Sequence, residues 1–250
     1  MEGSRGLGDV YKRQAFYREN YKKGIYGETM VNGNEMKRRI SKDLLNPLAF
    51  SIATTDMFYR FKKHDDGKYI YTKDRGWFFE KNLIENLNCF EGKRILDYKL
   101  PEYHSDIPMM IFSPSVVNDG RRLLISPQKI TFLCNTDTSL FSEKIALENI
   151  EFSTLFNKND PQYLKISSAM RMNATFPYIL PMVFLPSEPK IEVMDAGLRD
   201  NLGLTTSIKY IDNFKNWIHE HTSGVVIIQL RDREKKTKIK DKQSGSLISK

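Results

Sequence analysis

An aspartate that directly follows a short apolar strand is the residue of this sequence best placed to do chemistry. The pattern of Ile191–Met194 predicts the strand, and Asp195 is followed at once by the small residues Ala196 and Gly197. Reacting groups in open α/β sheets lie at the carboxyl ends of the strands, so this position favours a catalytic carboxylate. A plain turn is the alternative, in which the aspartate bonds its own backbone and the glycine supplies a positive φ.

The other side chains that could take part in a reaction fit structural roles better. Asp200 is expected at the cap of the following helix, where the helix dipole favours a carboxylate. His219 and His221 flank Glu220 without the His-Glu-x-x-His spacing of a metalloprotease, so we expect both rings at the surface. We predict no metal site. The remaining candidates are expected in polar loops or as small packing residues: His64, His104, Ser167 and Ser168.

The elements around Asp195 form a strand–helix–strand pattern. Apolar residues recur at helical spacing after Asn201 and predict a helix over about 201–219. The nearly all-apolar run 224–230 reads as a strand buried on both faces. Because a strand–helix–strand connection joins parallel strands, we expect this strand to run parallel to Ile191–Met194.

Further elements are predicted on the amino-terminal side of this unit. Segments 108–117 and 123–126 read as a hairpin that reverses at Asn118-Asp119-Gly120. Segment 165–175 reads as a helix that stops before Phe176-Pro177, because the residue before a proline avoids helix. Helical spacing also predicts helices over 43–61, 77–90 and 145–156, and loops are expected over 64–76 and 101–104.

The composition excludes several classes of protein. The chain has 250 residues, 40% of them hydrophobic, which indicates a globular fold. Its net charge of +8 favours an anionic partner or a solvated basic face. No nucleic-acid-binding signature accompanies the charge, so we predict no nucleic acid partner. Two cysteines in apolar surroundings, Cys89 and Cys134, are expected to be inert buried thiols.

The apolar runs are far shorter than the roughly 20 residues that a membrane-spanning helix needs. No secretory signal pattern opens the sequence. We therefore expect a cytoplasmic or peripheral membrane protein.

Several motifs together resemble the second half of a patatin-like phospholipase domain. The run Ser167-Ser168-Ala169-Met170, followed by 176–183, is similar to the family's small-residue helix leading into a proline-bearing apolar loop. Asp195-Ala196-Gly197 is similar to the catalytic Asp-Gly-Gly/Ala-Gly motif, and Asn201 to the asparagine that commonly follows it. The hairpin turn with Arg121 is also similar. The resemblance covers roughly residues 108–230.

The resemblance implies a three-layer α/β/α fold with a central, largely parallel sheet. It also implies a serine–aspartate dyad that hydrolyses a carboxylic ester of a lipid through an acyl-serine, with Asp195 as the base and no metal or organic cofactor. A carboxylate is a weak base for a hydroxyl, so its site must raise its pKa or stabilise the oxyanion that forms. In the family, backbone N–H groups of a glycine-rich loop stabilise that oxyanion.

The nucleophile of such a dyad is unknown here, because the sequence holds neither a Gly-x-Ser-x-Gly elbow nor a triple glycine. Residues 9–14 resemble the translation of a sequencing-library adapter; a natural basic terminus is the alternative. We therefore expect a domain truncated at its N-terminus and inactive by itself, with its serine upstream of Ala15. The expected divisions are a leader (1–14), a partial helical region (15–107), the core (108–231) and a charged linker or frayed end (232–250).

The expected partners are a lipid ester substrate and, through the basic charge and the aromatic helix 43–61, the surface of an anionic membrane. A non-catalytic module that binds lipid or protein is the alternative, because such a module needs no nucleophile.

Overall fold

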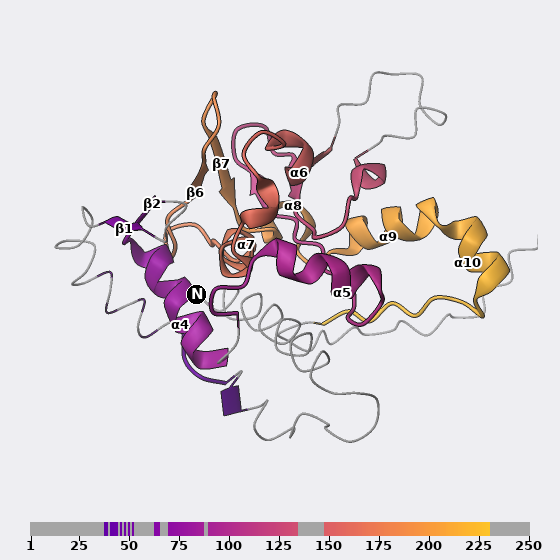
Figure 1. Cartoon of the computed structure of the whole chain (residues 1–250), viewed down its shortest axis with the longest axis horizontal. Helices are drawn as coiled ribbons and strands as arrows, with labels where there is room; N and C mark the ends of the chain where they lie inside the picture. Colours follow the sequence, from indigo (N-terminus) through magenta and orange to yellow (C-terminus); the bar gives the residue numbers. More distant parts are fainter. Residues whose placement is uncertain are drawn as a thin grey trace, which may run out of the picture.

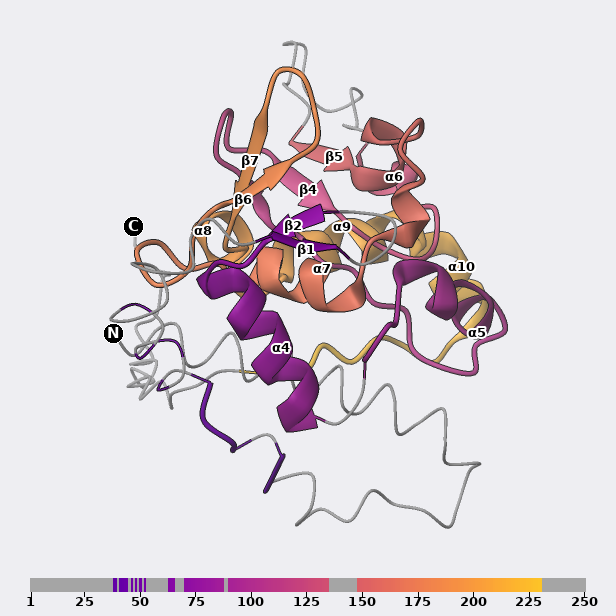
Figure 2. The same ribbon diagram turned by 60° about the vertical axis from the view of Figure 1, so that its left-hand side comes forward.

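A five-stranded sheet in the order β5-β4-β3-β7-β6 forms the centre of the molecule (Figures 1 and 2). The computed structural model describes residues 63–230 except 66–69, 88–89 and 135–147, together with 38–39, 41–44, 46, 48, 50 and 52. The strands are short: β3 (Ser115–Val116), β4 (Arg122–Leu124), β5 (Asn149–Glu151), β6 (Val183–Leu185) and β7 (Ile191–Met194).

The sheet is mixed and mostly antiparallel. Strands β3 and β4 form the predicted hairpin, which an isolated bridge between Phe112 and Ile125 extends. Gly120 closes its turn at a φ of 73°, a conformation that glycine adopts without steric cost. Strand β7 lies between β3 and β6 and is antiparallel to both, and only β4 and β5 are parallel. The prediction of a largely parallel sheet is therefore wrong.

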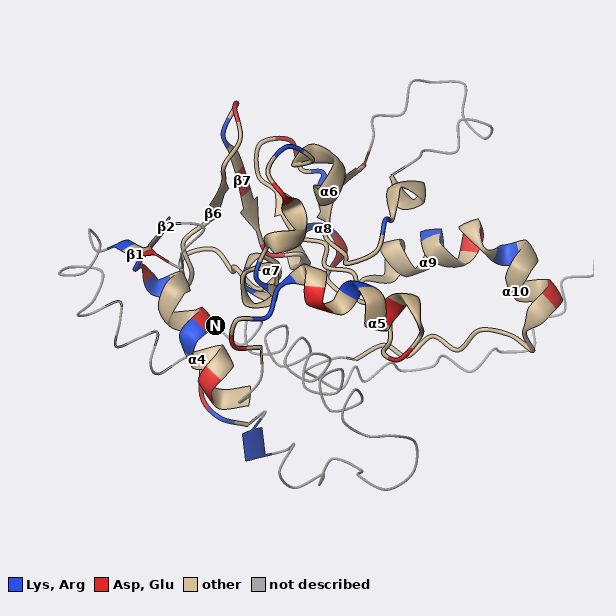
Figure 3. Cartoon of the chain, viewed as in Figure 1, with Lys and Arg blue, Asp and Glu red and all other residues tan. Residues whose placement is uncertain are grey.

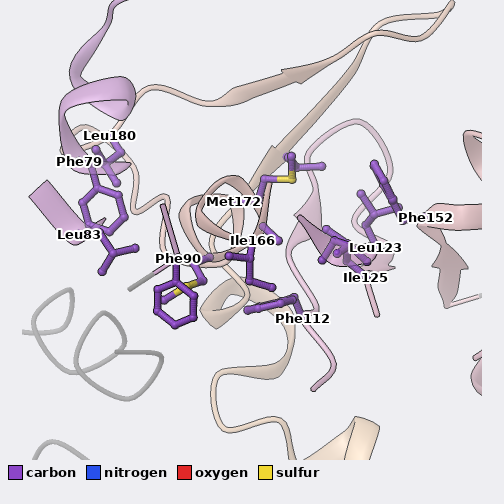
Figure 4. Close-up of a cluster of buried hydrophobic side chains, with 14 of the residues drawn as sticks. Phe79, Leu83, Phe90, Phe112, Leu123, Ile125, Phe152, Ile166, Met172 and Leu180 are labelled. Carbon is purple, nitrogen blue, oxygen red and sulfur yellow. The ribbon is translucent and has the colours of Figure 1, made fainter. Parts of the chain in front are cut away.

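Helix α7 (Ile166–Asn173) lies between the sheet and helix α4 (Arg75–Leu87), and both helices were predicted close to these bounds. Figure 4 shows Ile166 and Met172 of α7 between Phe79 and Leu83 of α4 on one side and Leu123 of β4 on the other. Seven of the eight residues of α7 are buried, so nearly its whole circumference is core. Its small residues Ser167, Ser168 and Ala169 allow that close packing.

The chain after β7 differs from the prediction of one helix over 201–219. It forms α8 (Gly197–Asp200), α9 (Leu204–Asn213) and α10 (Lys215–His221). Gly203 separates the first two, because its φ of 66° lies in the left-handed region that an α-helix cannot use. Asn201, expected to open the helix, instead follows the end of α8.

The segment 224–230 forms no strand, contrary to the prediction, and its apolar side chains are exposed. Val226 and Ile228 are 86% and 79% exposed. Both sides of β7 are occupied, by β3 and by β6, so no further strand can pair with it.

Other expectations fail locally. The predicted helix 145–156 contains β5 and only a short α6 (Phe152–Leu155), and the expected loop 101–104 lies in α5 (Lys99–Tyr103) and the turn after it. The expected loop 64–76 includes a small antiparallel sheet of β1 (Lys63–Asp65) and β2 (Ile70–Thr72) and the start of α4. Helix 43–61 and the leader fall mostly or wholly outside the described residues. The 3-10 helices are η1 (Ile95–Tyr98), η2 (Thr131–Leu133) and η3 (Pro161–Tyr163).

Among the described residues, no helix combines the length and apolar character needed to cross a membrane. Basic and acidic side chains alternate along α4, α5 and the α9–α10 region (Figure 3). Most of the basic clusters of the sequence, near residues 18–23, 60–63 and 231–242, lie outside the described part of the chain.

Candidate active site

Asp195 lies where β7 ends, as predicted, and its backbone is fastened on two sides. Its N–H donates to the carbonyl of Thr175 at 3.0 Å, and the N–H of Ala196 donates to the carbonyl of Asn173 at 3.3 Å. The hydroxyl of Ser115, at the start of β3, donates to the carbonyl of Asp195 at 3.0 Å. The end of α7 and the start of β3 therefore fix the position of the aspartate.

The carboxylate of Asp195 is buried and only half satisfied. Asp195 as a whole is only 2% exposed. Oδ1 accepts a hydrogen bond from the N–H of Gly197 at 2.5 Å, whereas Oδ2 is inaccessible to solvent and has no hydrogen-bond partner among the described residues. Burial raises the pKa of Asp195 above its ordinary value of 3.8, and the bond from Gly197 opposes that rise.

The turn interpretation of this motif is correct in one respect and wrong in another. The bond from Gly197 N–H to Asp195 is the local side-chain-to-backbone bond that such a turn predicts. Gly197 does not have a positive φ, however; it starts α8 with the backbone of a helix, and the positive φ nearby belongs to Gly203. The turn therefore uses one carboxylate oxygen and leaves the other free.

Asn173 is a polar residue of this site that the sequence reasoning missed. It is the last residue of α7 and is 0% exposed. Its Oδ1 accepts the N–H of Ser113 at 2.9 Å, and no residue that the structure describes bonds to its Nδ2. Its signal in the sequence was an uncharged polar residue between the apolar Met172 and Ala174.

The two residues expected to support the motif, Ala196 and Asn201, lie at the start and beyond the end of α8. Ala196 is buried and begins the turn into α8, and Asn201 is exposed beyond the end of that helix. Asp200 caps α9, as predicted: it accepts hydrogen bonds from the backbone N–H groups of Thr205 and Thr206 and from the hydroxyl of Thr206. Its carboxylate is therefore engaged in holding a helix.

Asp200 also takes part in a buried ionic cluster centred on Arg122. The guanidinium of Arg122 lies 3.5 Å from Asp200, 3.1 Å from Glu148 and 2.8 Å from the side-chain oxygen of Asn149. Lys209 of α9 lies 2.8 Å from Glu148, and that hydrogen bond lowers the pKa of the Glu148 carboxyl. The cluster joins α9 to β4 and β5 and has its charges paired.

Ser167 and Ser168 are not free nucleophiles. Both hydroxyls donate to Oε2 of Glu80 on α4, at 3.1 and 2.9 Å, and Arg171 lies 3.6 Å from the other oxygen of that carboxylate. The serines therefore join α4 to α7, which agrees with the prediction that they pack.

The histidines show no catalytic arrangement. His219 and His221 are exposed on α10, as predicted, with the ring of His221 stacked on Trp217. His64 lies in β1 beside Trp77, and exposed His104 follows α5. Within the described part of the chain, no group of three or more His, Cys, Asp or Glu residues could hold a metal ion.

Cys134 is partly buried, and burial, more than any neighbouring charge, raises the pKa of its thiol to about 11. At neutral pH it is therefore a protonated, unreactive thiol, in line with the prediction. Cys89 lies outside the described residues.

Comparisons of this chain with protein-family models, with curated proteins and with solved structures gave no match.

Proposed function

We propose that this chain carries the catalytic aspartate of a patatin-like lipid acyl hydrolase, with Asp195 as the general base of a serine–aspartate dyad. The observation that carries the proposal is the unpartnered Oδ2 of a buried strand-end carboxylate. The pKa of Asp195 is raised by that burial, which makes the carboxylate a stronger base than an exposed aspartate. The patatin-like three-layer arrangement belongs to the same proposal.

The proposed reaction is hydrolysis of a carboxylic ester in a phospholipid or related lipid. A serine hydroxyl gives its proton to Asp195 as its oxygen attacks the ester carbonyl, and Asp195 then gives that proton to the leaving alcohol. Water next attacks the acyl-serine, giving a proton to Asp195 that returns to the serine oxygen as the acid is released. Since the sequence contains no Gly-x-Ser-x-Gly, we propose that the serine and its oxyanion-binding loop lie upstream of Ala15 in the full-length protein. The proposal requires no metal or organic cofactor.

A non-catalytic module that binds a lipid surface or a protein is the second candidate. It is favoured by the apolar side chains exposed on the carboxyl-terminal side of Asp195, which include Leu198, Leu204, Ile208 and Trp217, and by those of segment 224–230. Exposed apolar patches of this kind are typical of interaction surfaces. The proposed membrane contact through basic residues rests on clusters mostly outside the described part of the chain.

One experiment distinguishes the two functions. The genomic sequence upstream of the Ala15 codon is read, and the complete reading frame is expressed and assayed with ester substrates, together with Asp195→Asn. The hydrolase proposal expects an upstream Gly-x-Ser-x-Gly and ester turnover that Asp195→Asn abolishes. An elbow without serine, or turnover that survives Asp195→Asn, refutes it and leaves the binding module.

The 250-residue chain itself is expected to be inactive. It serves as the control in the same assay, because it holds Asp195 without the elbow. Hydrolysis of a short-chain ester by this chain, lost in Asp195→Asn, would show that it contains its own nucleophile.

A further inference from the structure

Asp195 and Asn173 each have one buried polar atom that no described residue bonds, and the two atoms are complementary. Nδ2 of Asn173 is a hydrogen-bond donor, and Oδ2 of an ionised Asp195 is an acceptor. We propose that these two atoms bind a single hydroxyl oxygen, which accepts from Asn173 and donates its proton to Asp195. The hydroxyl is water in the resting protein; that it becomes the nucleophile's hydroxyl in the reaction rests on the proposed function.

The orientation of the Asn173 amide is fixed by its neighbour. The N–H of Ser113 points to Oδ1 of Asn173 at 2.9 Å. Turning the amide over would set its NH₂ group against that N–H, two donors facing each other with no acceptor. The atom of Asn173 that is free to bind a further group is therefore Nδ2, a donor.

The backbones that carry the two side chains are bonded to each other. Asp195 N–H donates to Thr175 and Ala196 N–H donates to Asn173, so segment 173–175 runs alongside 195–196. Both side chains are enclosed, since Asn173 is 0% and Asp195 2% exposed. Within the described part of the chain each of the two atoms lacks a hydrogen-bond partner, so no direct bond joins Oδ2 to Nδ2 there. A single bridging hydroxyl would satisfy both.

Because Nδ2 of Asn173 is a donor and Oδ2 of Asp195 is an acceptor, a hydroxyl suits the pair better than an ion does. An anion would be repelled by the carboxylate, and a cation would be repelled by the amide N–H. A hydroxyl oxygen accepts from one and donates to the other through one atom, which is how buried waters satisfy polar groups in protein interiors. With its proton held toward Asp195 and one lone pair held by Asn173, that oxygen is oriented for proton transfer.

Four hydroxyls of this region already donate elsewhere. Ser115 Oγ donates to the carbonyl of Asp195, and Thr175 Oγ1 donates to the carbonyl of Arg171 at 2.7 Å. Ser167 and Ser168 donate to Glu80. The proposal assigns the bound hydroxyl to water in the resting protein and to the upstream serine in the reaction.

The first test needs no activity. A high-resolution crystal structure of the protein is expected to show one water oxygen within about 3.2 Å of both Asp195 Oδ2 and Asn173 Nδ2. A direct bond between the two atoms, or a different partner for each, overturns the inference. This structure tests the bound water of the resting protein and not the role of the nucleophile.

The second test measures how Asn173 affects turnover by the full-length hydrolase. Asn173→Asp keeps the oxygen that Ser113 needs and replaces the free donor by an acceptor. We expect kcat to fall about 10²-fold with KM nearly unchanged, the size of the effect when one oriented donor is lost from an active site. Ser167→Ala is the matched control, since it removes a buried hydroxyl of the same helix that donates to Glu80, and it is expected to keep wild-type turnover.

The two proposals fail separately in this assay. If Asp195→Asn keeps its turnover, the proposed function is wrong. If Asp195→Asn is inactive but Asn173→Asp turns over like wild type, the hydroxyl-binding role of Asn173 alone is wrong. If Asn173→Asp and Ser167→Ala lose the same activity, the effect is general destabilisation and the role is again refuted.

Discussion

Replacing Gly76 by alanine is expected to destabilise the protein through Arg171. A Cβ atom built on Gly76 would lie 1.8 Å from Cζ of Arg171 and 2.1 Å from its Nε, so the guanidinium must move away. In its present position it lies 3.2 Å from Asp74, the residue before α4, and 3.6 Å from Glu80 within that helix. The arginine side chain is flexible, so the cost of the substitution is the loss of these ion pairs.

The magnitude follows from two opposing terms. A hydrogen bond to a charged group contributes about 1.5–3 kcal/mol to the free energy of unfolding, and we count the Arg171 guanidinium once. The Arg171 side chain is only 11% exposed, so solvent screens its ion pairs little. Alanine in place of glycine stabilises a helix by about 0.5–1 kcal/mol. The expected net change for Gly76→Ala is a loss of about 1–2 kcal/mol in the free energy of unfolding.

The same substitution should change sign when Arg171 is absent. In an Arg171→Met background no guanidinium lies over Gly76, so Gly76→Ala retains only the helix term and is expected to stabilise by about 0.5–1 kcal/mol. The four proteins are compared by urea unfolding, followed by circular dichroism and by the fluorescence of the neighbouring Trp77. Equal effects of Gly76→Ala in both backgrounds would refute the assignment of the cost to Arg171.

Three further predictions concern other parts of the molecule. The folded protein holds the Asp195 proton to higher pH than the unfolded chain, so this group's contribution to stability is complete below 3.8 and is lost as pH rises through the raised pKa; Asp195→Asn should remove that loss, and parallel curves of unfolding free energy against pH would contradict it. Arg122→Met should cost about 3–5 kcal/mol because it leaves Asp200 buried without its ionic partner, whereas Arg121→Met, at an exposed ion pair with Asp119, should cost less than about 1 kcal/mol; similar losses in urea unfolding would refute this. Val226→Lys with Ile228→Lys should leave stability within about 0.5 kcal/mol and reduce light scattering from aggregates, and a large loss of stability would show that these exposed side chains pack.

The sequence predicted elements whose signals are local. The Asn-Asp-Gly turn defines the β3–β4 hairpin, and Pro177 limits α7. The bounds of β7 were correct to the residue, because its apolar run stops at an aspartate. These features depend on residues close together in the chain, and the pattern of those residues was sufficient.

Features that depend on distant partners were not predictable in this way. The run 224–230 has the composition of a buried strand, but composition does not show which sheet edge is available, and β3 and β6 occupy both edges of β7. The break at Gly203 was missed because the apolar spacing continues across it. Asn173 was missed because its importance comes from Ser113 and Ala196, which are distant in sequence.

The placement of Asp195 at a strand end was correct although the rule behind it assumes parallel strands. With β3 and β6 antiparallel to β7, the carboxyl end of β7 meets the starts of its neighbours: Ser115 of β3 pairs with Met194, and Val183 of β6 pairs with Val193. The groups around Asp195 therefore come from segments that lead into strands, such as Ser113 before β3 and Thr175 before β6. In this geometry the backbone of 195–196 is held by the segment that leads from the end of α7 toward β6, which also carries Asn173, the proposed second partner of the bound hydroxyl.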